Sequence, residues 1–309
     1  LAADERVTGP PLVTGGQIFL VTETDKGHLL QISLDTGRQA VRLTFSQPLS
    51  APPVLLSDAA HLVIAGQQEV IYTLSLRPLA CQATSYLGHP AGSIEAPLLA
   101  MGGLVLLPQN EQSTGSAEDA KKSEDVDAAG DDTGTKSDSQ PAAAGDGESL
   151  VVVENDRIDS CLLRVIALTD NGRQLKQVTK VRVVGHVRDR PMLRGRSLFV
   201  PFAGERVAAF TVSDDPDHKP LTRVATHQVK TAHAGPIHLA VGSGGHLWMA
   251  SSKLQRFQLT TDSLQLNPNR IAEGISSQPL QSIGNQMFVG RRLPHSDSVV
   301  LTKVERDAE

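Results

Sequence analysis

Cysteine and the aromatic amino acids are scarce in this 309-residue chain, which has a single tryptophan. The two cysteines, Cys81 and Cys161, are too few for a disulfide framework. Neither belongs to a C-x-x-C motif, so we predict two small buried apolar residues, with one bridge in an extracytoplasmic compartment as the alternative. Aromatic residues make up 3% of the chain, so the core must consist mainly of Val, Leu, Ile and Ala.

Long apolar runs are also missing. No run approaches the roughly 18 apolar residues that indicate a membrane-spanning helix. Helical periodicity is weak throughout, and 26 glycines and 18 prolines interrupt the chain. The sequence begins at Leu1 without a signal-peptide pattern, so we expect a mature product or an excised fragment.

The stretch from Gly9 to Arg38 has the pattern of three short strands separated by turns. We predict one strand directly after Pro11, a nearly all-apolar strand over Gln17–Thr22 and an alternating strand over His28–Leu34. The breaks are rich in Gly and Asp, because glycine adopts positive φ at no steric cost and Asp tolerates the left-handed region. Six passages of the chain share this outline.

A proline opens each of these six units: Pro11, Pro53, Pro97, Pro191, Pro236 and Pro279. Successive prolines are 42, 44, 94, 45 and 43 residues apart. A period of about 40 to 50 residues with several short strands is typical of a β-propeller. We therefore predict an all-β fold, a single β-propeller over residues 1–309 with about six four-stranded antiparallel blades. A β-sandwich pair and a β-solenoid fit the period less well.

The sixth unit ends after its third strand, near Val304. We expect Glu5–Thr8 to supply the missing fourth strand, because an open ring would leave two edge faces exposed. If the chain is a fragment, seven or eight blades are the alternative.

The long spacing between Pro97 and Pro191 has a visible cause. Residues 111–149 contain no aromatic residue and, apart from Val126, no Val, Leu or Ile. Such a segment buries too little apolar surface to offset its ordering entropy, so we predict a disordered acidic insertion within the third blade, which resumes at Leu150. Its eleven acidic residues and three lysines give a net charge of −8, against −5 for the whole chain, which leaves about +3 for the remainder.

The first unit also resembles a known repeat. Residues 15–21 read Gly-Gly-Gln-Ile-Phe-Leu-Val, and residues 27–37 read Gly-His-Leu-Leu-Gln-Ile-Ser-Leu-Asp-Thr-Gly. This outline resembles the quinoprotein-like (PQQ-like) repeat of pyrroloquinoline-quinone dehydrogenases and of outer-membrane assembly lipoproteins of the BamB type. The resemblance implies a β-propeller and, for the non-catalytic BamB-type members, an interaction scaffold in the cell envelope or periplasm.

Few patterns point to chemistry. The quinone dehydrogenases use calcium with carboxylate ligands and commonly a Cys-Cys ring, and this chain has no Cys-Cys. We interpret residues 214–218, Asp-Asp-Pro-Asp-His, as a polar turn, because they lack the glycine and terminal glutamate of an EF-hand loop. Four histidines lie near one another without a standard zinc spacing, and we expect structural or surface roles for them: His227, His233, His238 and His246.

Basic residues concentrate between Lys180 and Arg206. Four of them form the predicted partner-binding basic rim: Arg188, Arg190, Arg194 and Arg196. An acidic partner, or the acidic insertion acting as an electrostatic lid, would bind such a rim, and an ordinary solvated face is the alternative. Nucleic acid is not expected, since the basic stretch lacks interleaved aromatic residues.

The sequence therefore predicts a non-catalytic β-propeller scaffold for protein–protein interaction, with no cofactor and no metal. We expect it to be envelope-associated or part of a larger protein. The alternative is a quinoprotein-type enzyme or a small-ligand binder with its site at the central channel, because propellers carry function on loops and at the channel mouth.

Overall fold

The computed structural model describes residues 4–88, 91–102, 148–156, 159–170, 172–215, 217–229, 235–242, 246–260, 263–276, 278–283, 286–296 and 298–305. Over these ranges every helix or strand is a β-strand, and all strand pairs are antiparallel. No apolar helix long enough to cross a bilayer occurs in the described part of the chain.

The strands form six sheets in sequence order, which we call blades 1 to 6. Blade 1 contains β1 (Arg6–Val7), β2 (Leu12–Thr14), β3 (Gln17–Glu23), β4 (Gly27–Ser33) and β5 (Gln39–Thr44). Blade 2 contains β6 (Val54–Leu55), β7 (His61–Gly66), β8 (Val70–Leu76) and β9 (Leu79–Tyr86). Blade 3 contains β10 (Leu99–Ala100), β11 (Glu148–Asn155), β12 (Ser160–Thr169) and β13 (Gln174–Val184).

The second half of the chain repeats this organisation. Blade 4 contains β14 (Met192–Arg194), β15 (Ser197–Phe202), β16 (Arg206–Val212) and β17 (Leu221–Gln228). Blade 5 contains β18 (His238–Val241), β19 (His246–Ala250), β20 (Lys253–Leu259) and β21 (Leu264–Glu273). Blade 6 contains β22 (Gln281–Ile283), β23 (Gln286–Arg292) and β24 (Val299–Glu305).

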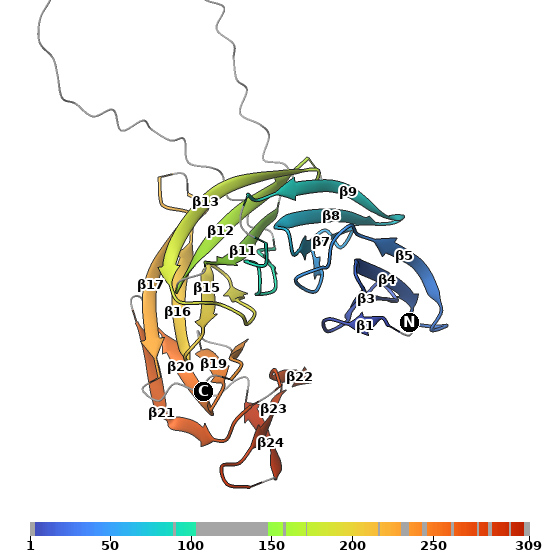
Figure 1. Cartoon of the computed structure of the whole chain (residues 1–309). Helices are drawn as coiled ribbons and strands as arrows, with labels where there is room; N and C mark the ends of the chain where they lie inside the picture. Colours follow the sequence, from blue (N-terminus) through green and yellow to red (C-terminus); the bar gives the residue numbers. More distant parts are fainter. Residues whose placement is uncertain are drawn as a thin grey trace, which may run out of the picture.

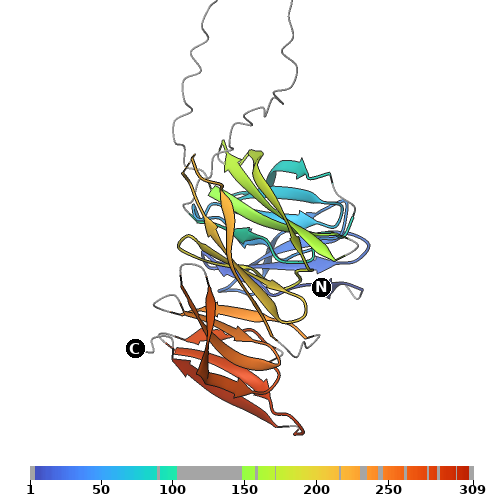
Figure 2. The ribbon, with the colours of Figure 1, turned by 90° about the vertical axis from the view of Figure 1, so that its left-hand side faces the viewer.

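The blades follow one another around an arc in sequence order, from the blue first blade to the red last one (Figure 1). Figure 2 shows the same succession from the side, with the green third blade and the red sixth blade at opposite ends of the view. The six predicted prolines precede β2, β6, β10, β14, β18 and β22 by one or two residues. Because proline has no N–H to donate, it suits the start of an edge strand.

The second strands are apolar on both faces because each lies between two neighbouring blades. In β7, Leu62 and Ile64 pack towards blade 1, whereas Val63 and Ala65 pack towards blade 3. All four side chains are 0% exposed. Five apolar clusters of this kind join the six blades in order, which explains the unbroken apolar strands of the sequence.

Closure of the ring differs from the prediction. The segment Glu5–Thr8 does not complete blade 6, because β1 pairs with β3 inside blade 1, with Arg6 opposite Glu23. The buried Glu5 carboxylate pairs with Arg42 at 3.1 Å, which holds this segment on its own blade. Over the described residues blade 6 has three strands, and no apolar cluster of those residues joins it to blade 1.

The predicted insertion lies between the first two strands of blade 3. Its C-terminal boundary was set two residues too far, because Glu148 and Ser149 belong to β11 and are buried. The Glu148 carboxylate accepts hydrogen bonds from the backbone N–H of Ser57 at 2.6 Å and from its hydroxyl at 3.0 Å. Residues 111–147 of the predicted insertion lie outside the described residues.

Both cysteines are free thiols. Cys161 is buried between blades 3 and 4 as expected, and burial raises its pKa to about 12. Cys81 was expected to be buried as well, but it is exposed. It lies on β9, the outermost strand of blade 2, where side chains alternate between the sheet and the solvent.

Hydrogen bonds tie each exit segment, the chain between the last strand of one blade and the first strand of the next, back to its own blade. In blade 2, the buried Glu69 carboxylate accepts the backbone N–H of Ser93 at 2.9 Å. In blade 3, Asn155 donates to the Val187 carbonyl at 2.8 Å and accepts the Val187 N–H at 2.9 Å. Backbone bonds do the same in blades 1, 4 and 5, namely Gly27 N to Gln47 O, Val229 N to Glu205 O and Ser276 N to Ser251 O.

The shared cores between blades predict where mutation is costly. We expect Leu62→Ala to lower the free energy of unfolding by about 2–5 kcal/mol, because it leaves a cavity between blades 1 and 2. Leu301→Ala is the matched control, since Leu301 is 70% exposed. Urea unfolding followed by circular dichroism measures both, and equal losses for the two variants would contradict the assigned core.

Candidate functional site at the central channel

A pocket of about 670 Å³, which we call the channel pocket, lies where the first strands of the blades converge. Six of its lining residues are prolines: Pro10, Pro11, Pro52, Pro53, Pro97 and Pro279. The rings are rigid and apolar and lack an N–H donor, so the wall keeps its shape and presents few hydrogen-bond donors. Four of the six opening prolines, Pro11, Pro53, Pro97 and Pro279, therefore line the central cavity.

Charged side chains line the same pocket. Arg188 donates from Nε to the Glu95 carboxylate at 3.1 Å, and this exposed pair joins the exit segments of blades 2 and 3. Arg190 is exposed at the pocket wall and makes no ion pair with any residue that the structure describes. A cation without a counter-ion at a pocket wall is suited to bind a carboxylate.

Asp189 connects two blades from within the pocket. Its carboxylate accepts the backbone N–H of Ile237 at 2.8 Å, directly before β18 of blade 5. Burial raises the pKa of Asp189, and the Ile237 N–H, His238 and Arg188 oppose that rise. This carboxyl group therefore fixes the backbone, and we assign it a structural role.

The four arginines of the predicted rim do not form one patch. Arg188 and Arg190 lie before β14, whereas Arg194 and Arg196 lie at the end of β14 and in the turn that follows. Arg194 donates to the Gly242 carbonyl in blade 5. Arg196 pairs with Asp214 at 2.7 Å. Arg188 and Arg190 are thus the two members of the set that line the channel pocket.

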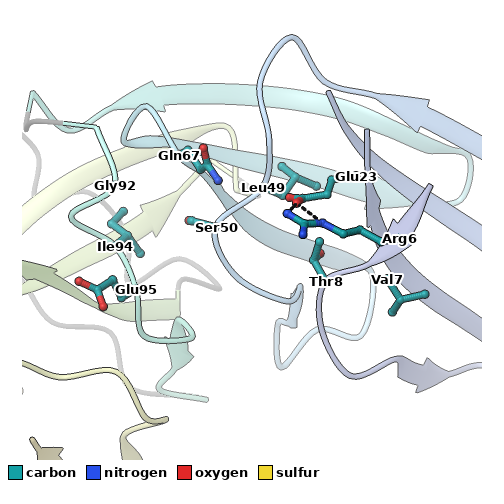
Figure 3. Close-up of a pocket in the computed structure, with 10 residues that line it drawn as sticks. All are labelled: Arg6, Val7, Thr8, Glu23, Leu49, Ser50, Gln67, Gly92, Ile94 and Glu95. Carbon is teal, nitrogen blue, oxygen red and sulfur yellow. Dashed lines mark hydrogen bonds and ion pairs between the residues drawn. The ribbon is translucent and has the colours of Figure 1, made fainter. Parts of the chain in front are cut away.

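A second pocket of about 660 Å³, which we call the rim groove, lies beside the channel pocket between blades 1 and 2. Figure 3 shows Arg6 and Glu23 on one wall, Ile94 and Glu95 on the opposite wall, and Ser50 between them. Arg6 donates from Nε to Glu23 at 2.7 Å. The sequence carried no signal for this groove, because its walls come from two blades and from segments far apart in the chain.

Two residues of the channel pocket could have been found from the sequence. Glu95 and Asp189 each stand two residues before an opening proline, Pro97 and Pro191. Since each opening proline leads into an inner strand, the position two residues earlier lies at the mouth of the channel in both repeats. The missed signal is an acidic residue at the same position in two repeats, two residues before the opening proline.

The histidines and acidic residues singled out in the sequence are spread over separate places. His227 packs against Phe257 with ring centroids 4.6 Å apart, and burial lowers its pKa. His246 lies within 3.1 Å of an Arg256 nitrogen, His238 lines the channel pocket, and His233 is outside the described residues. Asp215 binds His218 at 2.9 Å in an exposed turn.

The residues of the two pockets do not fit a quinone cofactor with calcium. Of the described residues that line them, none is Phe, Tyr or Trp, so neither pocket offers an aromatic stacking platform. Among the described residues, no group of three His, Cys, Asp or Glu side chains is placed to hold a metal ion. Both pockets instead combine apolar walls with ion pairs, and the channel pocket adds Arg190, which has no ion pair with a described residue.

Antiparallel four-stranded blades in sequence order around a channel define the chain as a β-propeller. No family model matches it, and no curated protein matches its sequence. Among solved structures it is similar to BamB from Moraxella catarrhalis, with a TM-score of 0.54 and 12% identity over 95% of this chain and 68% of that one. It is also similar to a putative 6-phosphogluconolactonase from Bacteroides uniformis, with a TM-score of 0.53 and 12% identity over 87% of this chain and 71% of that one.

Burial of Asp189 makes stability depend on pH. Because its pKa is raised above the ordinary 3.8, the folded protein retains a proton that the unfolded chain has already lost. The contribution of this group to the free energy of unfolding therefore falls as pH rises from 3.8 through the raised pKa. Asp189→Asn keeps an acceptor for the Ile237 N–H and removes the titration.

We expect Asp189→Asn to match the wild type at about pH 3 and to exceed its stability at about pH 7. Urea midpoints at the two pH values measure the difference. Asp217→Asn, in an exposed turn, is the control. A stability difference between Asp189→Asn and wild type that stays constant with pH would exclude the assigned burial effect.

Proposed function

We propose that this β-propeller is a non-catalytic scaffold that binds a protein partner at the channel pocket. One observation carries the proposal: a cavity of about 670 Å³ has rigid proline walls, and the exposed Arg190 on its wall lacks an ion-pair partner among the described residues. An apolar cavity accepts an anchor side chain of a partner, and an adjacent cation orients it. The residue resemblance to BamB-type members supports an envelope location, which is part of the proposal.

The other charged groups of the pocket favour binding over acid–base catalysis. Glu95 is paired with Arg188, and Asp189 accepts a backbone N–H. A general acid or base needs a titratable group directed at a reacting atom, with hydrogen-bond geometry to it. A small-ligand binder is the second candidate, because the volume of the channel pocket is in the range of ligand sites.

Site-specific photo-crosslinking tests the proposal. We expect p-benzoylphenylalanine in place of Pro279 to crosslink a protein partner in the cells that produce the chain, because this exposed residue lies on the pocket wall and its replacement leaves Arg190 in place. The same replacement of Arg223, which is exposed on the outer strand β17, is the control and should give no such product. Absence of a product specific to position 279 would contradict a partner site at the channel.

Calorimetric titration separates the scaffold from the quinone enzyme. We expect no heat of binding when the purified protein is titrated with calcium and pyrroloquinoline quinone, since the lining residues include no Phe, Tyr or Trp on which the quinone could stack. Saturable binding of both would overturn the scaffold and direct attention to the carboxylates of the channel.

A further inference from the structure

The rim groove and the channel pocket adjoin. Three residues, Thr8, Ser50 and Glu95, line both of them. A ligand long enough to occupy the groove beside β1 and the proline-lined cavity would pass over these three residues. Two such cavities in a row suit an elongated ligand better than a compact one.

One wall of the groove is an unpaired strand edge. β1 is at the end of its sheet, with β3 as its only neighbour among the described strands. The Thr8 N–H donates to the Val21 carbonyl at 3.1 Å, on the β3 side. Because hydrogen-bonding direction alternates along an antiparallel strand, the N–H and C=O of Val7 point away from β3. Arg6, Val7 and Thr8 all line the groove, so a donor and an acceptor that have no backbone partner among the described residues border it.

The side chains of the site limit the chemistry of its ligand. Leu49 and Ile94 are buried beneath the groove, and Ser50 and Thr8 supply hydroxyl groups. The described lining contains no Phe, Tyr or Trp, so neither pocket is built to stack sugar rings or nucleobases. A polypeptide backbone matches the free edge of β1, since it carries alternating N–H and C=O groups at the same spacing.

Charge sets one further requirement. Each wall carries one ion pair, Arg6–Glu23 on one side and Arg188–Glu95 on the other, and within each pair the two charges neutralise each other. Arg190 remains without an ion pair to a described residue, at the channel end of the site. A carboxylate on the ligand would neutralise it through charge-assisted hydrogen bonds.

We propose that the groove and the channel pocket together bind an extended, acidic peptide segment of the partner. The peptide adds a strand to β1 through the N–H and C=O of Val7 and places a carboxylate on Arg190. This inference rests on the proposed scaffold function and specifies the chemistry of its partner.

The probe is a phage-displayed library of random peptides about twelve residues long, selected on the immobilised full chain. We expect the selected peptides to be enriched in Asp and Glu. Synthetic copies are then measured by fluorescence anisotropy, with N-methyl groups placed on one backbone amide at a time. Methylation should abolish binding at the one amide that donates to the Val7 carbonyl and leave it unchanged at the amides on either side, because β1 offers a single outward N–H and C=O pair, at Val7.

Protein variants test the two contacts separately. We expect Val7→Pro, which removes the free N–H, and Arg190→Gln to weaken peptide binding about tenfold or more each. Arg196→Gln removes an equal charge beyond the far end of β14 and should leave the affinity unchanged. Melting temperatures verify folding, and the N-methylated peptides test the strand pairing without any change to the protein.

Two results would overturn the inference: an equal effect of N-methylation at every backbone amide of the peptide, or equal peptide affinity of wild type and Arg190→Gln. Crosslinking of a partner at position 279 together with either result would leave the scaffold function intact and reject only the extended-peptide mode. Failure of crosslinking would instead reject the scaffold function itself.

Discussion

The hydrogen bonds between each blade and its exit segment determine where the functional residues lie. In blade 3, Asn155 exchanges two hydrogen bonds with Val187, and the channel residues Arg188 and Asp189 follow directly. In blade 2, the Glu69 carboxylate holds Ser93, two residues before Glu95. Since an unpaired backbone group is costly when buried, these contacts fix one path for the connection. The hydrogen bonds that satisfy the backbone N–H groups of the exit segments therefore position the residues at the channel mouth.

Two buried carboxylates, those of Glu69 and Glu205, hold neighbouring segments in place at the cost of desolvation and of an unfavourable backbone conformation. Glu69 and Glu205 both adopt positive φ, 59° and 56°, and both are 0% exposed. Burial raises the pKa of Glu69, while the hydrogen bonds from Ser93 oppose the rise. Glu205 accepts the N–H of Ser252 at 2.8 Å and so reaches the next blade. A side chain in such a strained and desolvated position persists because its surroundings fully determine it.

Much of the fold could be predicted because the repeat is a local pattern. Pro11 and the strand over Gln17–Thr22 identify one blade, and the second strands β7, β11 and β15 of the next three blades are apolar and buried on both faces. The pairing of Arg6 within blade 1 could not be predicted, because so short a strand carries no pattern that selects β3 over a strand of blade 6. The separation of Arg190 from Arg194 was missed because a cluster of charges in the sequence does not show that β14 runs between them and places them at its opposite ends. The groove was missed since Val7 becomes a free edge only after the blades assemble.

Among the described residues each blade shares a core with its sequence neighbours only, an arrangement typical of a short one-dimensional array. Interior blades have two stabilising interfaces, whereas blades 1 and 6 have one each among the described clusters. We therefore expect unfolding to begin at the ends, with the amide protons of β24 exchanging before those of β11 or β15. A peptide bound to both β1 and Arg190 would link blade 1 to the segment that leads into blade 4. Occupancy of the groove would therefore reduce local unfolding of blade 1.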